Sequence, residues 1–209
     1  MEALFHRIGR DRLVPVEVGR DYTDPQWTQT LMPLHAFVAT YIAPESPVET
    51  HGGIIDHDDG AMHGLRRDTT DHTVGYMAQH ALLEQAPILR NDFSIPDYCF
   101  LTADDTLPDA GVATHFWLGP AGTVSATHTD PQDNLFVQVV GAKKVLLWPP
   151  NDHMYPFPYG SLLSNTSQVD PLRIDRTAFP DFPMASALSI VVQAGDMLFI
   201  PRGWWHHIR

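Results

Sequence analysis

The feature that most constrains the fold of this chain is a series of short strand-like segments that begins at residue 114. Apolar and β-branched stretches alternate there with turns that contain glycine or proline, a pattern typical of strands joined by tight connections. We expect strands at 114–118, 134–140, 143–148, 188–193, 197–200 and 204–208. The second and third should form a hairpin around Gly141-Ala142. Many short strands after a helical front section predict a mainly β fold with flanking helices, arranged as a double-sheet jelly roll.

The front section should supply a strand and a long helix. Residues 13–18 are predicted to form a short edge strand, because Pro15 cannot donate the amide hydrogen bond that a central strand requires. Thr23-Asp24-Pro25 is a typical helix start, and apolar residues follow it at helical spacing as far as Ile42. An amphipathic helix ending at Pro44 is therefore expected. We also expect a strand at 74–77, a short helix at 79–85 and an extended segment at 92–99.

Residues 45–72 differ in character from the rest of the chain. They are rich in glycine and acidic residues and show no periodicity, which predicts a mobile surface insertion within a single domain, 1–209. The insertion contains four histidines, whose spacing matches no closed zinc pattern: His51, His57, His63 and His72. A solvated loop is therefore favoured over a second metal site.

Charge and composition exclude some classes of function. The net charge is -12, from 13 basic and 25 acidic residues, whereas nucleic-acid binders are usually basic, so direct nucleic-acid binding is not expected. The acidity favours a basic protein partner, or serves only solubility. No apolar run is long enough for a membrane span, and the first residues do not resemble a secretion signal. With Cys99 as the single cysteine, an intracellular location, nuclear or cytoplasmic, is expected.

The motif His128-Thr129-Asp130, with a second histidine far downstream, predicts a metal centre. Residues i and i+2 of a strand point to the same face, so His128 and Asp130 can reach one ion. His206 and His207 are adjacent and must point to opposite faces, so only one of them can complete the set. Two imidazoles and a carboxylate form the facial triad that holds non-haem Fe(II) and leaves positions open. A zinc hydrolase is the alternative, but the sequence contains no HExxH motif.

Three neighbouring residues strengthen this prediction: Ser125, Asn134 and Lys143. Lys143 belongs to an otherwise apolar strand, and a lysine that faces a barrel interior requires an anionic partner. A dicarboxylate cosubstrate would supply that partner. The alternative is a surface lysine beside Lys144, since alternation allows only one of the two to point inward.

Several longer segments resemble one enzyme family. WLGPAGTVSATHTDPQDNLFVQVVGAKKVLLWPP and GDMLFIPRGWWHHIR resemble the core of a jumonji-C (JmjC) 2-oxoglutarate oxygenase. VPVEVGRDYTDPQWTQTLMPL, VGYMAQHALLEQ, SIPDYC and NTSQVD resemble its protein-arginine hydroxylase branch. The resemblance covers nearly the whole chain outside residues 45–72 and implies a JmjC, cupin-type double-stranded β-helix. Relative to the family, the chain should be truncated at both ends, because the first strands and the closing strands are absent.

The resemblance also implies roles for individual residues. Fe(II) is bound by His128, Asp130 and His206; 2-oxoglutarate is bound by Lys143 at its far carboxylate, by Tyr76 and Ser125, and by Asn134 near its keto acid. The substrate arginine is held by Glu17 and Trp117, with Gln79 lining the same pocket. Judged without the resemblance, Tyr76 and Trp117 would be core aromatics and Glu17 a solvated charge.

We therefore expect an Fe(II)- and 2-oxoglutarate-dependent dioxygenase, with O2 as the other cosubstrate, that hydroxylates arginine side chains in a basic protein or peptide. One alternative is a histone methyl-lysine demethylase of the same JmjC class. Another is a non-catalytic, truncated JmjC scaffold that binds proteins but no metal.

Overall fold

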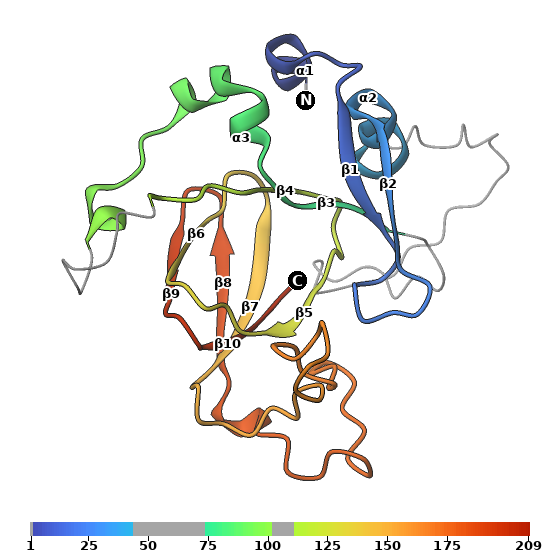
Figure 1. The fold of residues 1–209 in the computed structure, drawn as a ribbon, viewed down its shortest axis with the longest axis vertical. Helices are drawn as coiled ribbons and strands as arrows, with labels where there is room; N and C mark the ends of the chain where they lie inside the picture. Colours follow the sequence, from blue (N-terminus) through green and yellow to red (C-terminus); the bar gives the residue numbers. More distant parts are fainter. Residues whose placement is uncertain (1, 44–73, 102–110) are drawn as a thin grey trace, which may run out of the picture.

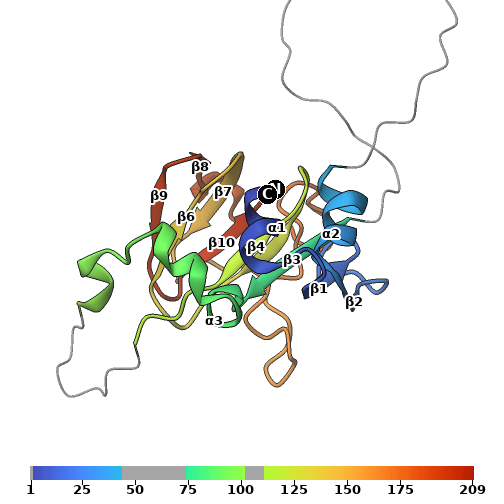
Figure 2. The same cartoon turned by 90° about the horizontal axis from the view of Figure 1, so that it is seen from above.

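The computed structural model describes residues 2–43, 74–101 and 111–209, and their strands form three sheets (Figures 1 and 2). The first sheet has the strand order β2-β1-β3-β4, the second has the order β5-β10-β7-β8, and β6 pairs with β9. The first four strands are β1 (Leu13–Val18), β2 (Thr28–Pro33), β3 (Gly75–His80) and β4 (Phe116–Leu118). The others are β5 (Ser125–His128), β6 (Asn134–Val137), β7 (Ala142–Trp148), β8 (Leu188–Gln193), β9 (Met197–Ile200) and β10 (Trp205–Ile208).

The helices of the described residues are short. They are α1 (Glu2–Ile8), α2 (Leu34–Phe37), α3 (Leu82–Gln85), a π-helical turn (Val38–Ile42) and 3-10 turns at Pro87–Asp92, Asp97–Phe100 and Met184–Ser186. Figure 1 shows α1 and α2 beside β1 and β2, and the long loops between β7 and β8 at the far end of the second sheet. No helix in the described part of the chain is long and apolar enough to cross a membrane.

One face of the first sheet packs against the helices. Val14 and Val16 of β1 are fully buried in a core with Leu34 and Phe37 of α2 and with Met77 of β3. Because side chains alternate along a strand, the residues between these face the other side of the sheet. This second face of the first sheet, which does not contact the helices, carries polar residues that include Glu17.

The structure corrects two expectations for the front section. The prediction of one long helix was wrong in its first half. Thr28–Pro33 is strand β2, which pairs with β1 along its whole length, and helical structure begins only at Leu34. Tertiary pairing overrides the helical spacing here. The strand Leu13–Val18 has the expected bounds, but it lies between β2 and β3 and is not an edge. Pro15 is tolerated because β3 pairs only with Glu17 and Val18.

The hairpin expected around Gly141 does not form. The two segments are strands, β6 and β7, but β6 pairs with β9 whereas β7 pairs with β10 and β8. The chain crosses at this point from one sheet to the sheet that faces it, and Gly141 makes the crossing with a positive φ of 78°. This crossing is what a jelly roll requires, so the fold class was predicted correctly although the local pairing was not.

The remaining elements agree with expectation to within a few residues. The strands at 188–193 and 197–200 are confirmed, and those at 74–77, 114–118 and 204–208 have shifted ends. The expected helix at 79–85 is only Leu82–Gln85, and the segment 92–99 is partly coiled into 3-10 turns. The predicted insertion at 45–72 lies outside the described residues.

The two faces of the second sheet pack against different partners. Leu146 and Trp148 point outward, into a cluster with Met154, Val169 and Phe182 from the long loops. Val145 and Leu147 point inward, into a cluster that contains Val192 of β8 and Ile200 of β9. The inner face of the second sheet and the β6–β9 sheet therefore enclose the barrel interior.

Candidate metal centre and adjoining pocket

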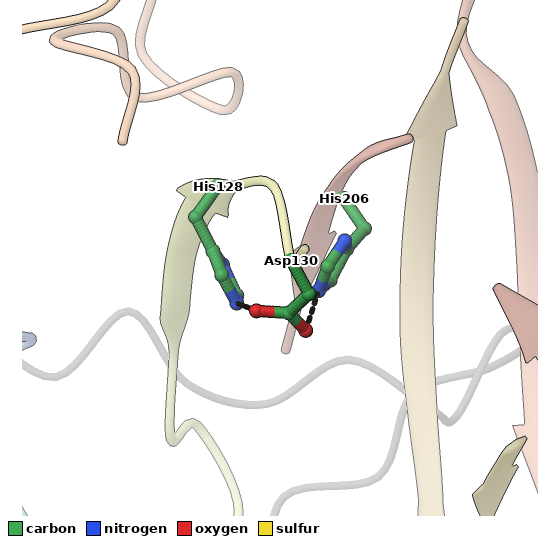
Figure 3. Close-up of side chains that lie close together, drawn as sticks. All are labelled: His128, Asp130 and His206. Atoms are coloured by element: carbon green, nitrogen blue, oxygen red, sulfur yellow. Dashed lines mark ion pairs between the residues drawn. The ribbon is translucent and has the colours of Figure 1, made fainter. Parts of the chain in front are cut away.

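The three expected metal ligands meet at the inner face of the second sheet. His206 of β10 lies directly opposite His128 of β5 in the antiparallel pairing, and their ring centroids are 4.2 Å apart. The Asp130 carboxylate lies between them, with its oxygens 3.8 Å from His128 Nε2 and 3.6 Å from His206 Nε2 (Figure 3). One ligand atom from each residue lies within 4.8 Å of the other two. This spacing is compact enough for a single ion.

Backbone carbonyls orient both imidazoles. His128 Nδ1 lies 2.7 Å from the Ala126 carbonyl oxygen, and His206 Nδ1 lies 3.1 Å from that of Trp204. A ring nitrogen beside a carbonyl must carry the proton, which leaves the lone pair of each Nε2 directed at the centre. Burial lowers the pKa of His206, and the neighbouring His128 lowers it further, so this ring stays neutral as a ligand must be.

Asp130 reaches the centre from a turn. Strand β5 ends at His128, and the turn that follows is held by backbone contacts on both sides. Gly203 N donates to the Asp130 carbonyl oxygen at 2.9 Å. Thr129 N donates to the Asn165 carbonyl oxygen, and Asn165 Nδ2 donates back to the Thr129 carbonyl oxygen, both at 2.9 Å. These bonds fix the carboxylate without requiring a continued strand.

An irregularity in β5 places Ser125 on the same face as His128. Residues three apart in a regular strand point to opposite faces, but β10 pairs His206 with His128 and Ile208 with Ser125. Two residues of β10 thus span three of β5, which is a β-bulge at Ala126 and Thr127. The bulge turns Ser125 inward, where its side chain hydrogen-bonds with that of Tyr76.

A half-buried lysine faces the barrel interior and contacts Tyr76. Lys143 shares the inner face of β7 with Val145 and Leu147, while Lys144 is exposed on the other face. The Lys143 ammonium donates to the Tyr76 hydroxyl at 2.9 Å and lies 5.0 Å from the centre of that ring. Burial lowers its pKa to about 8. Within the described residues no carboxylate pairs with Lys143, so this ammonium has no counterion among them.

Burial also determines the state of Tyr76. Burial raises the pKa of its hydroxyl, so the group is protonated at physiological pH and can donate to an anion. The ring lies against the backbone at Gly119, where an added Cβ would come within 2.6 Å of the ring. A side chain at this position would therefore clash with Tyr76 and with Thr123 unless one of them moved.

The second face of the first sheet carries the residues expected to hold a substrate. Glu17 of β1 lies directly opposite Tyr76 of β3, so both point away from the helical core. Trp117 of β4 is exposed between Phe116 and Leu118, which pack into that core. Burial raises the pKa of the Glu17 carboxyl, and a hydrogen bond from Trp27 opposes that shift. Glu17 and Trp117 therefore share the face on which Tyr76 meets Lys143.

Two further expected residues are less closely tied to the site. Gln79 is exposed at an irregular part of β3 and has a positive φ of 44°, a conformation that non-glycine residues rarely adopt. Asn134 begins β6 opposite the buried Ile200, so it faces the barrel interior. Neither side chain forms a hydrogen bond with another described residue.

The sequence did not single out Tyr22 and Trp27. Trp27 Nε1 donates to Glu17 Oε2 at 3.2 Å, and the Tyr22 ring packs edge-on against His128 with centroids 6.4 Å apart. Both residues lie in the loop between β1 and β2; Trp27 belongs to the stretch that we expected to be helical, and Tyr22 precedes it. No local pattern in the sequence indicates these contacts, because they depend on the pairing of β2 with β1 and on the approach of β5.

His207 has no part in the centre. It pairs with Leu146 and so points to the outer face, where it is buried, and neither ring nitrogen has a hydrogen-bond partner among the described residues. It lines a small polar pocket with Thr127, Asp21 and Asp170. Its position settles which of the two adjacent histidines faces the triad.

The residues present at the centre fit an Fe(II) ion. Two neutral imidazoles and one carboxylate, all on one side, are the donor set of the facial triad, and that set leaves coordination positions open for cosubstrates. The Nε2 atoms of both rings and the Asp130 carboxylate come together within 4.8 Å of one another, and Figure 3 shows the carboxylate between the two rings. Facing β-sheets around such a centre define a metal-binding domain of the cupin type.

Comparison with known proteins agrees. A family model described as cupin-like domain matches residues 27–209. Lysine-specific demethylase 8 of Xenopus tropicalis is 39% identical over 207 residues, which are 98% of this chain and 40% of that protein. Jumonji C domain-containing protein 5 of Drosophila melanogaster is 34% identical over 204 residues, which are 97% of this chain and 45% of that protein. The chain belongs to the cupin-like domain family, in its jumonji-C group.

One solved structure shows a more distant likeness. The structure of E. coli ycfD aligns with a TM-score of 0.42 and 14% identity, over 99% of this chain and 41% of that chain. In all three cases the chain spans less than half the length of the protein that it matches.

Proposed function

We propose that this chain is the catalytic part of an Fe(II)- and 2-oxoglutarate-dependent oxygenase that hydroxylates an arginine side chain in a protein or peptide. The single observation that carries the proposal is the position of Glu17. Its carboxylate lies on the same sheet face as Tyr76, whose hydroxyl contacts Lys143 in the anion pocket beside the triad. In this proposal the Glu17 carboxylate binds a cationic group and the Lys143 ammonium binds an anionic group, both beside the metal centre.

The Lys143 pocket suits the far carboxylate of 2-oxoglutarate. A buried ammonium without a counterion is stabilised by an anion, and the Tyr76 and Ser125 hydroxyls can add hydrogen bonds to the same carboxylate. The other end of the cosubstrate would then reach toward the open side of His128, Asp130 and His206, with Asn134 near its keto acid. In this proposal Lys143, Tyr76 and Ser125 hold the cosubstrate in one orientation and exclude water.

The Glu17 pocket suits a guanidinium. A carboxylate accepts paired hydrogen bonds from arginine, and the faces of Trp27 and Trp117 can pack against the planar cation. Gln79 is placed on the neighbouring strand, where it could line the same pocket. The net charge of -12 would draw a basic peptide toward this surface.

In this proposal different residues bind the metal, the cosubstrate and the substrate. Bound Fe(II) would supply the activation of O2 that no side chain here can provide, with 2-oxoglutarate converted to succinate and CO2 as the substrate C–H becomes C–OH. Lys143 and its hydroxyl partners would fix the cosubstrate, and Glu17 would fix the carbon to be oxidised at the open side of the triad. Positioning of this kind is the main contribution that a protein makes to cofactor chemistry.

A peptide panel tests the proposal. Peptides of one sequence that carry arginine, lysine or dimethyllysine at the central position are incubated with the protein, Fe(II), ascorbate and 2-oxoglutarate, and the products are examined by mass spectrometry. We expect one added oxygen on the arginine peptide, with equimolar succinate, and no product from His128→Ala. Glu17→Gln should lose peptide oxidation but keep 2-oxoglutarate binding. Succinate formation that does not depend on any peptide would contradict the arginine proposal.

The second candidate is demethylation of methyl-lysine. It is favoured by the name of a relative, lysine-specific demethylase 8 of Xenopus tropicalis. The reaction would use the same metal centre and cosubstrate, with the methylammonium held by the aromatic faces near Glu17. Loss of a methyl group from the dimethyllysine peptide, with release of formaldehyde and an unchanged arginine peptide, would favour it.

A further inference from the structure

Tyr22 connects the loop between β1 and β2 to the strand that carries His128. Its hydroxyl donates to the Ala126 carbonyl oxygen at 3.3 Å, across 104 residues of sequence. The same carbonyl oxygen accepts the hydrogen bond from His128 Nδ1 at 2.7 Å. One backbone acceptor therefore serves a metal ligand and a tyrosine from the loop between β1 and β2.

The β-bulge explains why this carbonyl needs support. Ala126 and Thr127 are the residues of β5 that face no partner in the register with β10, so the backbone there is not fixed by regular pairing. His128 depends on the position of Ala126 because the carbonyl sets which ring nitrogen carries the proton. The bulge that turns Ser125 inward thus leaves the support of His128 to contacts outside the strand.

Tyr22 is held firmly enough to provide such a contact. Its side chain also hydrogen-bonds with that of Thr166, and Thr166 is bridged to His128 on the other side of β5. The loop around it is fixed by Asp21, which accepts bonds from Thr23 N and Arg20 Nε, both at 2.9 Å. Burial raises the pKa of the Tyr22 hydroxyl to about 12, so it remains a donor throughout the physiological range.

We propose that Tyr22 is a positioning residue for the metal ligand His128: its hydroxyl holds the Ala126 carbonyl, and the carbonyl fixes the tautomer and ring plane of His128. The inference rests on the metal centre of the proposed function but not on its substrate. The β1–β2 loop would then have two roles: Trp27 contacts Glu17 at the proposed substrate site, and Tyr22 supports a metal ligand.

The test compares two tyrosine-to-phenylalanine variants. Tyr22→Phe keeps the ring that packs against His128 and removes only the hydroxyl. Tyr155→Phe is the matched control, because the Tyr155 hydroxyl also has a backbone partner at 3.3 Å, Asp181 N, but makes no contact with the triad. Each protein is titrated with Co(II), and the Kd and the visible absorption bands are recorded, together with the thermal stability of the metal-free protein.

We expect Tyr22→Phe to weaken Co(II) binding by about tenfold and to shift the absorption bands, because loss of an outer contact to a metal ligand typically has an effect of this size. Tyr155→Phe should leave both unchanged. Lower stability of metal-free Tyr22→Phe with unchanged Kd and bands would overturn the inference in favour of a purely structural role. No effect on any readout would also overturn it. Failure of the wild-type protein to bind Co(II) would overturn the metal centre itself, and the inference with it.

Discussion

The two faces of β10 carry adjacent histidines with the same degree of burial and different surroundings. His206 is 2% exposed and His207 is 3% exposed. On the inner face, His206 Nδ1 has a carbonyl acceptor and Nε2 lies 3.6 Å from Asp130. On the outer face, His207 has no hydrogen-bond partner among the described residues. The comparison shows that burial alone does not make a histidine a metal ligand. A ligand histidine also needs an acceptor for one ring nitrogen and a carboxylate that faces the other.

The same contrast recurs on β7. Lys143 and Lys144 are adjacent, but only Lys143 faces the barrel interior and donates to Tyr76. Because the side-chain period of a strand is two residues, a shift of one residue in β10 would exchange the two histidines, and a shift of one residue in β7 would exchange the two lysines. The registers of these two strands therefore decide which histidine and which lysine face the barrel interior.

The largest effect should follow removal of the inner histidine. His206→Ala should weaken binding of Co(II) or Fe(II) by more than about 100-fold, since loss of an outer contact alone costs about 10- to 100-fold. Metal content after gel filtration and a Co(II) titration measure this. Equal loss of metal in His207→Ala would break the distinction between the faces.

The second largest effect should follow replacement of Lys143, the inward-facing one of the two adjacent lysines. Lys143→Met should raise the Kd for 2-oxoglutarate by about 30- to 150-fold, since a lost charge-assisted hydrogen bond costs about 2–3 kcal/mol. Calorimetry with Mn(II) in the site gives the constant. Lys144→Met is the control and should bind as the wild type does; a similar loss in both variants would mean that general charge, and not the pocket, attracts the cosubstrate.

Sequence alone could predict the parts of this site that follow from alternation. The two-residue period predicts that only one of His206 and His207, and only one of Lys143 and Lys144, can face inward; in the structure His206 lies opposite His128, and Lys143 donates to Tyr76. The choice between His206 and His207 did not follow from alternation, because the register of β10 is set by residues far away in sequence. It came from the resemblance to a family.

The parts that sequence could not supply depend on long-range pairing. The sequence around Gly141 resembles a hairpin because it contains two strand-like segments joined by a short turn. Local sequence does not reveal that β6 pairs with β9, which is distant in the sequence. The role of Tyr22 depends on a bulge in β5 and on contacts across 104 residues. Helical spacing in TQTLMP was misleading because pairing with β1 outweighs local propensity.

The third effect is a pH dependence on the inner face. Burial lowers the pKa of Lys143 to about 8, so the ammonium loses its proton above that pH unless an anion is bound. Binding of 2-oxoglutarate needs the charged form, and its affinity should fall about tenfold between pH 7 and pH 9. Calorimetry at pH 9 in buffers of different ionisation enthalpy should show proton uptake on binding. Lys143→Met should show neither effect, and a pH dependence that persists in it would assign the titration elsewhere.

The smallest effect should come from the outer histidine. A buried polar group without a partner lowers stability, and replacing it by an apolar group of similar shape is nearly neutral or stabilising. His207→Phe should therefore leave the Co(II) Kd unchanged and should change the free energy of unfolding by less than about 1 kcal/mol, in the stabilising direction. Urea unfolding of the metal-free protein measures this. Thr127→Val is the companion variant, because the Thr127 hydroxyl in the same pocket is also buried without a partner among the described residues. Marked destabilisation of both variants would show that the two groups bind a shared occupant of that pocket, and the outer face would then be a second polar site and not the inert counterpart of the first.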